Sequence, residues 1–290
     1  MTRPITVGVD GSAESLAAAD WAASEALRRN LPLRVVHAWH WEPLTVPVVN
    51  DRDAQAEWAR TLLSDAGRRL TERHPGLEHT AEILDREPVP ALVDAAKDAE
   101  MLVLGSRGHG AIAGFLLGSH AQQVIAAAGR PVVSVRAPAD GEEVPADGAV
   151  VVGQQGSAED SAAVLRFAFE TAAARGVPLR AVRAWNLPPV FAYSPVVMWP
   201  GDELGDLAAH HREQLTAALS PWREKFPEVP VDEHVELGPG GQVLLAGTAG
   251  ASLLVVGRRV RRVPVGARIG SVAHAALHHA RCPVAVVPHD

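Results

Sequence analysis

The sequence contains two copies of one pattern, and this internal repeat restricts the possible folds more than any other feature. Four segments of the first half return in the second half in the same order, which chance does not explain. The matched pairs are VGVDGSAES with VGQQGSAEDS, LPLRVVHAW with VPLRAVRAW, LVLGSRG with LVVGRRV, and RPVVSV with CPVAVV. Each copy is therefore expected to form the same structural unit, and the sequence predicts a tandem duplication.

A segment typical of linkers separates the two copies. The stretch APADGEEVPADG is rich in proline, glycine and acidic residues, which favour turns and exposed chain. We therefore predict a first domain over residues 1–137, a linker over 138–148 and a second domain over 149–290. The total of 290 residues suits two domains of ordinary size, each long enough to bury a core.

Short apolar runs alternate with helical patterns along each copy. In the first copy, strands are expected near residues 5–9, 33–39, 78–84, 101–104 and 131–135, and helices over 52–73, 88–98 and from 119 onward. Ser12 or Ser15 is expected to cap another helix, an alanine-rich one that runs to about Arg29. Strands that alternate with helices imply an α/β fold, in which a parallel sheet is covered on both faces.

The composition excludes several classes of protein. No uninterrupted apolar run approaches the roughly 18–20 residues of a membrane span, so no membrane association is expected. A net charge of −7 argues against general nucleic-acid binding, which needs a basic face. The N-terminus lacks a signal-peptide profile, and the single cysteine, Cys282, excludes an internal disulfide framework. These features predict a cytoplasmic protein.

A glycine-rich loop between a strand and a helix is the strongest functional signal. The apolar run Met101–Leu104 stops at Gly105, and the next helical pattern begins at Gly118-Ser119. Glycines allow main-chain N–H groups to approach a ligand closely, and a helix N-terminus favours phosphate. The loop therefore suits anion binding, although a purely structural loop is the alternative.

The spacing of this loop is more specific than its glycine content. Gly105, two residues, Gly108, nine residues and Gly118-Ser119 resemble the ATP-binding motif of the universal stress protein family. The loop is neither a Walker A loop nor a dinucleotide-binding fingerprint. The resemblance implies two tandem open parallel five-stranded sheets of order 3-2-1-4-5, similar to adenine nucleotide alpha hydrolases. In such sheets the ligand lies at the point where the strand order reverses, beyond the carboxyl ends of the first and fourth strands.

The resemblance also implies roles for residues of the first half. The phosphates of ATP are expected to meet a set of loop residues, namely Gly105, Arg107, Gly108, Gly118, Ser119 and the N–H of His120. Asp10 is expected near the adenosine, with Gly8 allowing close approach, and the main chain of Ala38 near the adenine. An Asx turn or a helix cap is the alternative role of Asp10. No structural metal is expected, and Mg²⁺ is expected only as the companion of the ATP phosphates.

The second half keeps only part of the pattern. Gly257 and Gly270-Ser271 remain at the matching spacing, but Gln155 replaces the aspartate and Val260 replaces the second loop glycine. The loop has also become basic, with Arg258, Arg259, Arg261, Arg262 and Arg268. Either these arginines hold phosphates in place of backbone contacts, or they form a solvated or partner-binding surface on a site that has lost its function.

Taken with the resemblance, these features predict an ATP-binding regulatory protein of the stress response that has little or no turnover. The alternatives are a slow ATPase or nucleotidyl-transfer enzyme of the same fold, and an interaction protein with vestigial nucleotide sites. No catalytic residue is assigned. Single-domain members of the family pair through their last strand, so the two halves are expected to pair in this way. A homodimer of the tandem chain and an unidentified protein partner are also expected.

Overall fold

The protein folds into two compact units, Met1–Glu143 and Val144–Asp290. The computed structural model describes residues 2–40, 52–106, 118–137, 145, 147–187, 203–260 and 269–290. Most of the predicted linker therefore lies outside the described residues. Of the helices in these ranges, none combines the length and the apolar character needed to cross a membrane.

The first unit contains five parallel strands that alternate with four helices. They are β1 (Ile5–Gly8), α1 (Ala13–Arg29), β2 (Leu33–Ala38), α2 (Arg52–Arg73), β3 (His79–Leu84), α3 (Pro88–Lys97), β4 (Met101–Gly105), α4 (Ser119–Ala127) and β5 (Val132–Val135). The strand order is β3-β2-β1-β4-β5, and each neighbouring pair is parallel. This confirms the predicted order 3-2-1-4-5.

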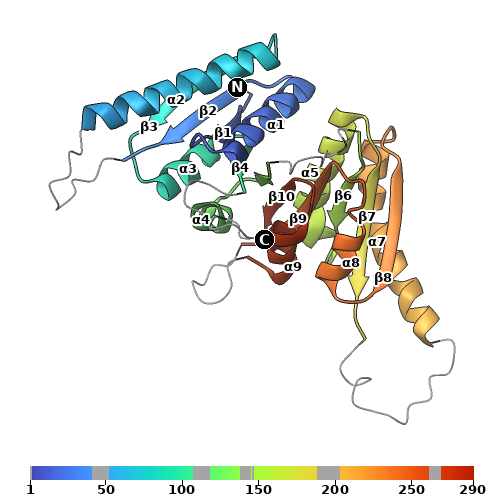
Figure 1. Ribbon diagram of the computed structural model, residues 1–290. Helices are drawn as coiled ribbons and strands as arrows, with labels where there is room; N and C mark the ends of the chain where they lie inside the picture. The colour runs from blue at the N-terminus through green and yellow to red at the C-terminus, as the bar shows by residue number, and fades with distance from the viewer. Residues whose placement is uncertain are drawn as a thin grey trace. The chain divides into compact units, whose positions relative to one another are not determined.

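The helices of the first unit cover both faces of its sheet, as the near-continuous apolar sequence of the central strands requires. Helix α1 packs on β1, β4 and α2, whereas α3 and α4 pack on each other on the opposite face (Figure 1). Small side chains on α1, such as Ala18 and Ala22, are fully buried and let this helix lie close to the sheet. Ser12 caps α1 by accepting a hydrogen bond from the Ser15 amide, which decides between the two predicted caps.

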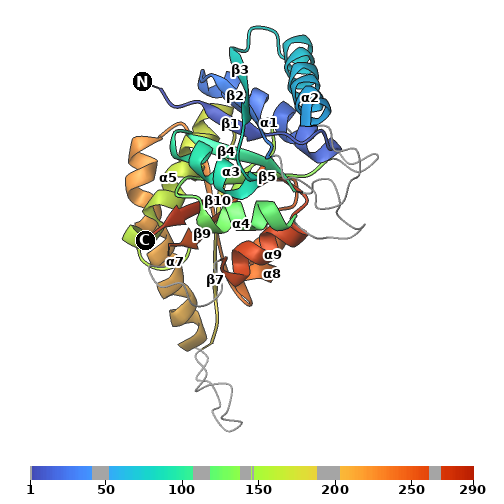
Figure 2. The ribbon, with the colours of Figure 1, turned by 90° about the vertical axis from the view of Figure 1, so that its left-hand side faces the viewer.

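The second unit repeats this arrangement. Its elements are β6 (Val150–Gly153), α5 (Ala158–Arg175), β7 (Leu179–Trp185), α7 (Glu203–Lys225), β8 (Val231–Leu237), α8 (Gly240–Ala246), β9 (Leu253–Arg259), α9 (Ser271–His279) and β10 (Val284–His289). The strands are parallel and follow the order β8-β7-β6-β9-β10. Figure 2 shows α5 and α7 on one side of these strands, with α8 and α9 on the other. The predicted duplication is therefore a duplication of structure.

Candidate functional site

The carboxyl ends of three neighbouring strands bring the predicted site residues of the first unit together. Gly8 of β1 is in register with Val36 of β2 and Leu104 of β4. Asp10 follows β1, Ala38 ends β2 and Gly105 ends β4. These three residues, which are far apart in the sequence, therefore lie along one edge of the sheet, where the strand order reverses. We call it the carboxyl edge.

Helix α4 begins at the same edge. The Gly118 amide donates a hydrogen bond of 2.9 Å to the Ser106 carbonyl, and the Ser106 amide donates one of 2.7 Å to the Val135 carbonyl. The two ends of the glycine-rich loop are thus joined, and Ser119 and His120 are exposed beside them. Arg107 and Gly108, which were also predicted to bind phosphate, lie outside the described residues.

The first turn of α4 presents main-chain donors that no side chain of the described residues caps. Gly118 is the N-cap residue with extended dihedrals (φ −58°, ψ 142°), and as a glycine it has no side chain that could accept a hydrogen bond from the first turn. The first amides of a helix have no acceptor inside the helix, so this end carries a partial positive charge. The nearby Ser106 hydroxyl is buried and has no hydrogen-bond partner among the described residues. Both features suit an anionic ligand that brings its own acceptors.

Asp10 forms the Asx turn that was its alternative interpretation. Its Oδ1 accepts hydrogen bonds from the Ser12 amide at 3.0 Å and from the Ser12 hydroxyl at 2.5 Å. The Asp10 amide donates to the Ser15 hydroxyl at 3.2 Å, and the intervening Gly11 has φ +82°. The carboxylate is only partly buried, so the turn fixes its position and leaves it within reach of solvent.

Two of the predicted glycines have a packing role. A Cβ atom on Gly8 would lie 2.9 Å from Cδ2 of Leu104. A Cβ atom on Gly105 would lie 2.8 Å from the Glu14 carbonyl carbon and the Ser15 nitrogen, so β4 approaches the first turn of α1 closely. The fold itself therefore requires glycine at Gly105, where a Cβ would meet backbone atoms, whereas at Gly8 the Leu104 side chain would have to shift. A ligand-binding role for either residue stays a prediction.

Two aromatic residues near this edge were not predicted. His37 is 6% exposed, and its Nδ1 donates a hydrogen bond of 2.7 Å to the Val9 carbonyl. The edge of one ring meets the face of the other between His37 and Trp58, with centroids 5.6 Å apart. The histidine could have been found as the one polar ring in the apolar strand LRVVHA, whereas nothing in the helical pattern marks Trp58.

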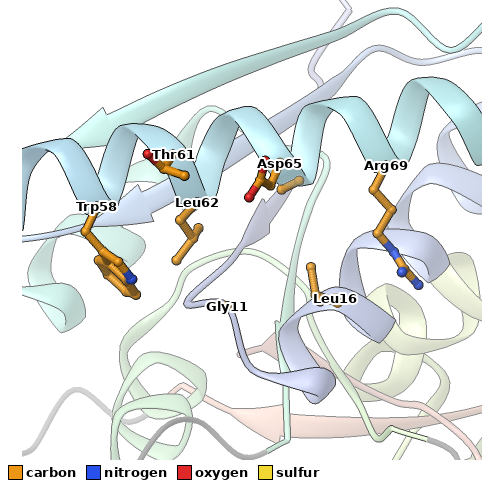
Figure 3. A pocket seen from close by; sticks show the side chains of 8 residues that line it. Gly11, Leu16, Trp58, Thr61, Leu62, Asp65 and Arg69 are labelled. Atoms are coloured by element: carbon orange, nitrogen blue, oxygen red, sulfur yellow. The ribbon is translucent and has the colours of Figure 1, made fainter.

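Trp58 lines a pocket of about 380 Å³ beside the Asp10 turn. Trp58, Leu62 and Arg69 extend from α2 toward Gly11 and helix α1 (Figure 3). Trp58 is 51% exposed, so much of its ring is open to a ligand. The remaining lining residues are Leu16, Thr61, Asp65 and Ala66. This size lies within the usual range of small-molecule sites.

The second unit holds the matching helix cap with a different carboxylate. Gly156 takes the same left-handed conformation as Gly11, with φ +79°, and Ser157 caps α5. The Ser157 amide donates to Oδ2 of Asp160 at 3.1 Å, whereas Gln155 is exposed. Hydrogen bonds from the amide and the side chain of Ser157 lower the pKa of Asp160. The capping carboxylate has thus moved from the strand end into the helix.

The loop after β9 also differs from the loop after β4. Strand β9 continues two residues beyond Gly257, and the Val260 amide donates to the His289 carbonyl at 2.7 Å. A Cβ atom on Gly257 would lie 2.8 Å from Nε2 of His289, so β10 packs over this glycine. Gly270 and Ser271 still begin α9 without a side-chain cap, and both are exposed. Arg261, Arg262 and Arg268 lie outside the described residues.

Comparisons with known proteins identify the family. The model of the Universal stress protein family matches residues 1–136 and 148–288. The chain belongs to the universal stress protein family. Universal stress protein Rv2005c of Mycobacterium tuberculosis is 36% identical over 293 residues, which cover 97% of this chain and 96% of that protein. The predicted resemblance is confirmed, and both units carry the family pattern.

Solved structures of universal stress proteins share the fold. One from Archaeoglobus fulgidus aligns over 99% of this chain and 98% of its own, with a TM-score of 0.72 and 18% identity. A shorter universal stress protein from Archaeoglobus fulgidus has been solved in complex with dAMP. This relative therefore binds a nucleotide. It is 29% identical and covers 46% of this chain and 98% of its own, with a TM-score of 0.35.

Proposed function

We propose that the first unit binds ATP at its carboxyl edge and acts as a nucleotide-responsive regulator with little or no turnover. The phosphates would lie against the first turn of α4, and the adenosine would lie toward Asp10 and Ala38. Mg²⁺ would accompany the phosphates. A change in a surface read by a protein partner would follow from nucleotide binding, since a ligand shifts an equilibrium toward the state it prefers.

The uncapped first turn of α4 beside the buried Ser106 hydroxyl is the observation that carries this proposal. The dipole of one helix contributes only about 0.3–1 kcal/mol to anion binding. Hydrogen bonds to a charged group contribute about 1.5–3 kcal/mol each, so several amides together supply most of the affinity. Helix α1 lacks this capacity because Ser12 caps its first turn.

The adenosine end has support from the pocket beside Gly11. A nucleoside has a planar base and a polar sugar, and the pocket offers an exposed tryptophan ring together with the carboxylate of Asp65. Stacking of a base on an aromatic side chain contributes about 1–3 kcal/mol. The Asp10 carboxylate, held in place by its turn, would accept hydrogen bonds from a ribose hydroxyl or the adenine amino group.

A slow ATPase or nucleotidyl-transfer enzyme is the alternative. His120 is exposed at the start of α4, and no residue at this edge is assigned as nucleophile, general base or arginine finger. We therefore expect binding without appreciable hydrolysis. The cytoplasmic location and the homodimer belong to the same proposal.

Isothermal calorimetry on the folded, ligand-stripped chain tests the binding step. We expect a saturable heat with ATP and a stoichiometry of one nucleotide per chain. No heat at millimolar ATP would contradict the proposal. A turnover assay under the same conditions separates the alternatives, since hydrolysis well above about one per minute is the mark of an enzyme rather than a sensor.

A further inference from the structure

Arg183 of β7 is a buried cation, and the groups that bond it within the described residues are all uncharged hydrogen-bond acceptors. It is 8% exposed. Its Nη1 donates to Oε1 of Gln154 and, at 3.3 Å, to the Gly156 carbonyl, and its Nη2 donates to Oε1 of Gln214 at 2.5 Å. Its Nε donates to Nδ1 of His211 at 3.4 Å. Within the described part of the chain, no carboxylate pairs with this guanidinium.

A buried charge without a counter-ion is costly, because neutral dipoles replace only part of the lost hydration. Burial accordingly lowers the pKa of Arg183. The corresponding position in the first unit is His37, so this arginine is particular to the second unit. A negative ligand would supply the charge that the surrounding amides do not.

Further donors surround this guanidinium. Trp185 lies two residues along β7, on the same face of the sheet, and its indole stacks on His211 with ring centroids 5.1 Å apart. The Nε1 atom of Trp185 is buried and has no hydrogen-bond partner among the described residues. The equivalent Trp39 of the first unit donates its Nε1 proton to Gln55 at 3.3 Å. The second unit thus leaves a donor unused where the first unit uses it.

The network is accessible from the side of α7. Gln214 and His210 are exposed, and the Gln214 amide nitrogen donates to Nε2 of His210 at 2.9 Å. Gln214 therefore covers Nη2 of Arg183 as a neutral, exchangeable partner. A charged acceptor forms a hydrogen bond roughly twice as strong as a neutral one, so an anion would displace this amide.

We propose that Arg183, Trp185 and His211 form an anion site, covered by Gln214 in the ligand-free chain, that takes a phosphate group, either free or as a monoester. Phosphate suits these donors because a planar guanidinium binds two of its oxygens and leaves others for the indole and imidazole protons. The site lies on the face of the second sheet that α7 covers, whereas α9, which Gly270 and Ser271 begin, lies on the other side of the strands. It does not rest on nucleotide binding by the first unit.

The His211 imidazole reports on this site by NMR in the ligand-stripped full chain, with its signals assigned by their loss in His211→Gln. We expect saturable shifts with inorganic phosphate and with glycerol phosphate, and much weaker shifts with acetate at equal ionic strength. Arg183→Gln should abolish these shifts. Arg183→Lys should weaken phosphate binding at least about tenfold, because lysine cannot donate two parallel hydrogen bonds to the phosphate as arginine does. Gly118→Val, which removes the proposed phosphate site of the first unit, should leave them unchanged. Shifts that persist in Arg183→Gln, or that never saturate, would overturn the proposal.

Gln214→Ala is a second test that does not depend on the folding of the Arg183 variants. Because Gln214 competes with the ligand for Nη2, its removal should tighten phosphate binding severalfold. A purely structural network predicts that this variant binds phosphate no better than the wild type, and that result would contradict the anion site.

Discussion

The two units share a fold but distribute charge differently at their carboxyl edges. In the first unit a carboxylate, Asp10, follows the first strand, and the buried residue on the neighbouring strand is a histidine, His37. In the second unit the strand-end residue is Gln155, and the buried strand residue is the cation Arg183. The helix cap survives in both because Asp160 replaces Asp10 as the acceptor for the cap amide. In the second unit the carboxylate that completes the cap is therefore no longer the residue that follows the first strand.

The loops show the same division. Strand β4 ends at Gly105 and the next amide, that of Ser106, is bonded to β5, whereas β9 continues to Arg259 and the Val260 amide is bonded to β10. The second unit therefore extends its sheet through Arg259, and the sequence of the first unit has a glycine, Gly108, at the position of Val260. This difference favours the interpretation that the second nucleotide site has lost its function.

Paired valine substitutions at the two helix starts should give the largest effect. Gly118→Val places a branched side chain over the first-turn amides, and we expect ATP affinity to fall at least about 100-fold through the loss of two charge-assisted hydrogen bonds. The φ and ψ of Gly118 are extended values that valine adopts, so the fold should persist. Gly270→Val is the matched control, since nothing lies within 4 Å of its added Cβ and ATP affinity should not change. Equal losses in both variants would show that the units are functionally alike.

Substitution of Asp10 should give the next largest effect. Asp10→Ala should weaken ATP about tenfold and inorganic phosphate less, because the carboxylate is expected to contact the adenosine. Asp10→Asn keeps an acceptor for the Ser12 amide, so it separates the turn from the charge. If the asparagine variant binds ATP like the wild type, the negative charge of Asp10 is not needed for nucleotide binding.

Ser106→Ala tests the buried hydroxyl at the carboxyl edge. Removal of an unpaired buried hydroxyl should leave the free energy of unfolding unchanged or raise it by about 1 kcal/mol, while ATP affinity falls about three- to tenfold. Denaturant unfolding and calorimetry measure the two quantities. A clear loss of stability together with unchanged affinity would assign the hydroxyl to the fold.

The relocated cap of the second unit should give the smallest effect, a change in acid sensitivity. A lowered pKa means that Asp160 stabilises the folded chain above the ordinary aspartate pKa of about 3.9, and that this contribution disappears as the pH falls through the folded-state value. Asp160→Asn should therefore melt at a lower temperature than the wild type near neutral pH. The difference between the two melting temperatures should become smaller as the pH drops below about 4. Glu159→Gln is the control, because it removes a negative charge at the residue before Asp160 and leaves the cap acceptor in place. A melting-temperature difference that is independent of pH would argue against this role.

Most of the fold was predictable because local sequence patterns, which occur in both copies, predict its strands and helices. The helix predicted over 52–73 is α2, and the strand predicted over 101–104 is β4. The strand order of the family predicted that Asp10 and Gly105 lie at the same edge of the sheet. The close packing around Gly8 and Gly105 was not predictable from the sequence, because the contacting residues, Leu104 and Glu14, belong to other elements of the fold. Trp58 and the Arg183 network were also missed, because tertiary contacts alone place them beside the strand ends.

A crystal structure of the chain grown with ATP is the most direct test of the difference between the two units. We expect a triphosphate against the first turn of α4, with the base toward Asp10 and Trp58, and no nucleotide at the start of α9. A nucleotide bound in both units alike, or at α9 alone, would contradict this expectation.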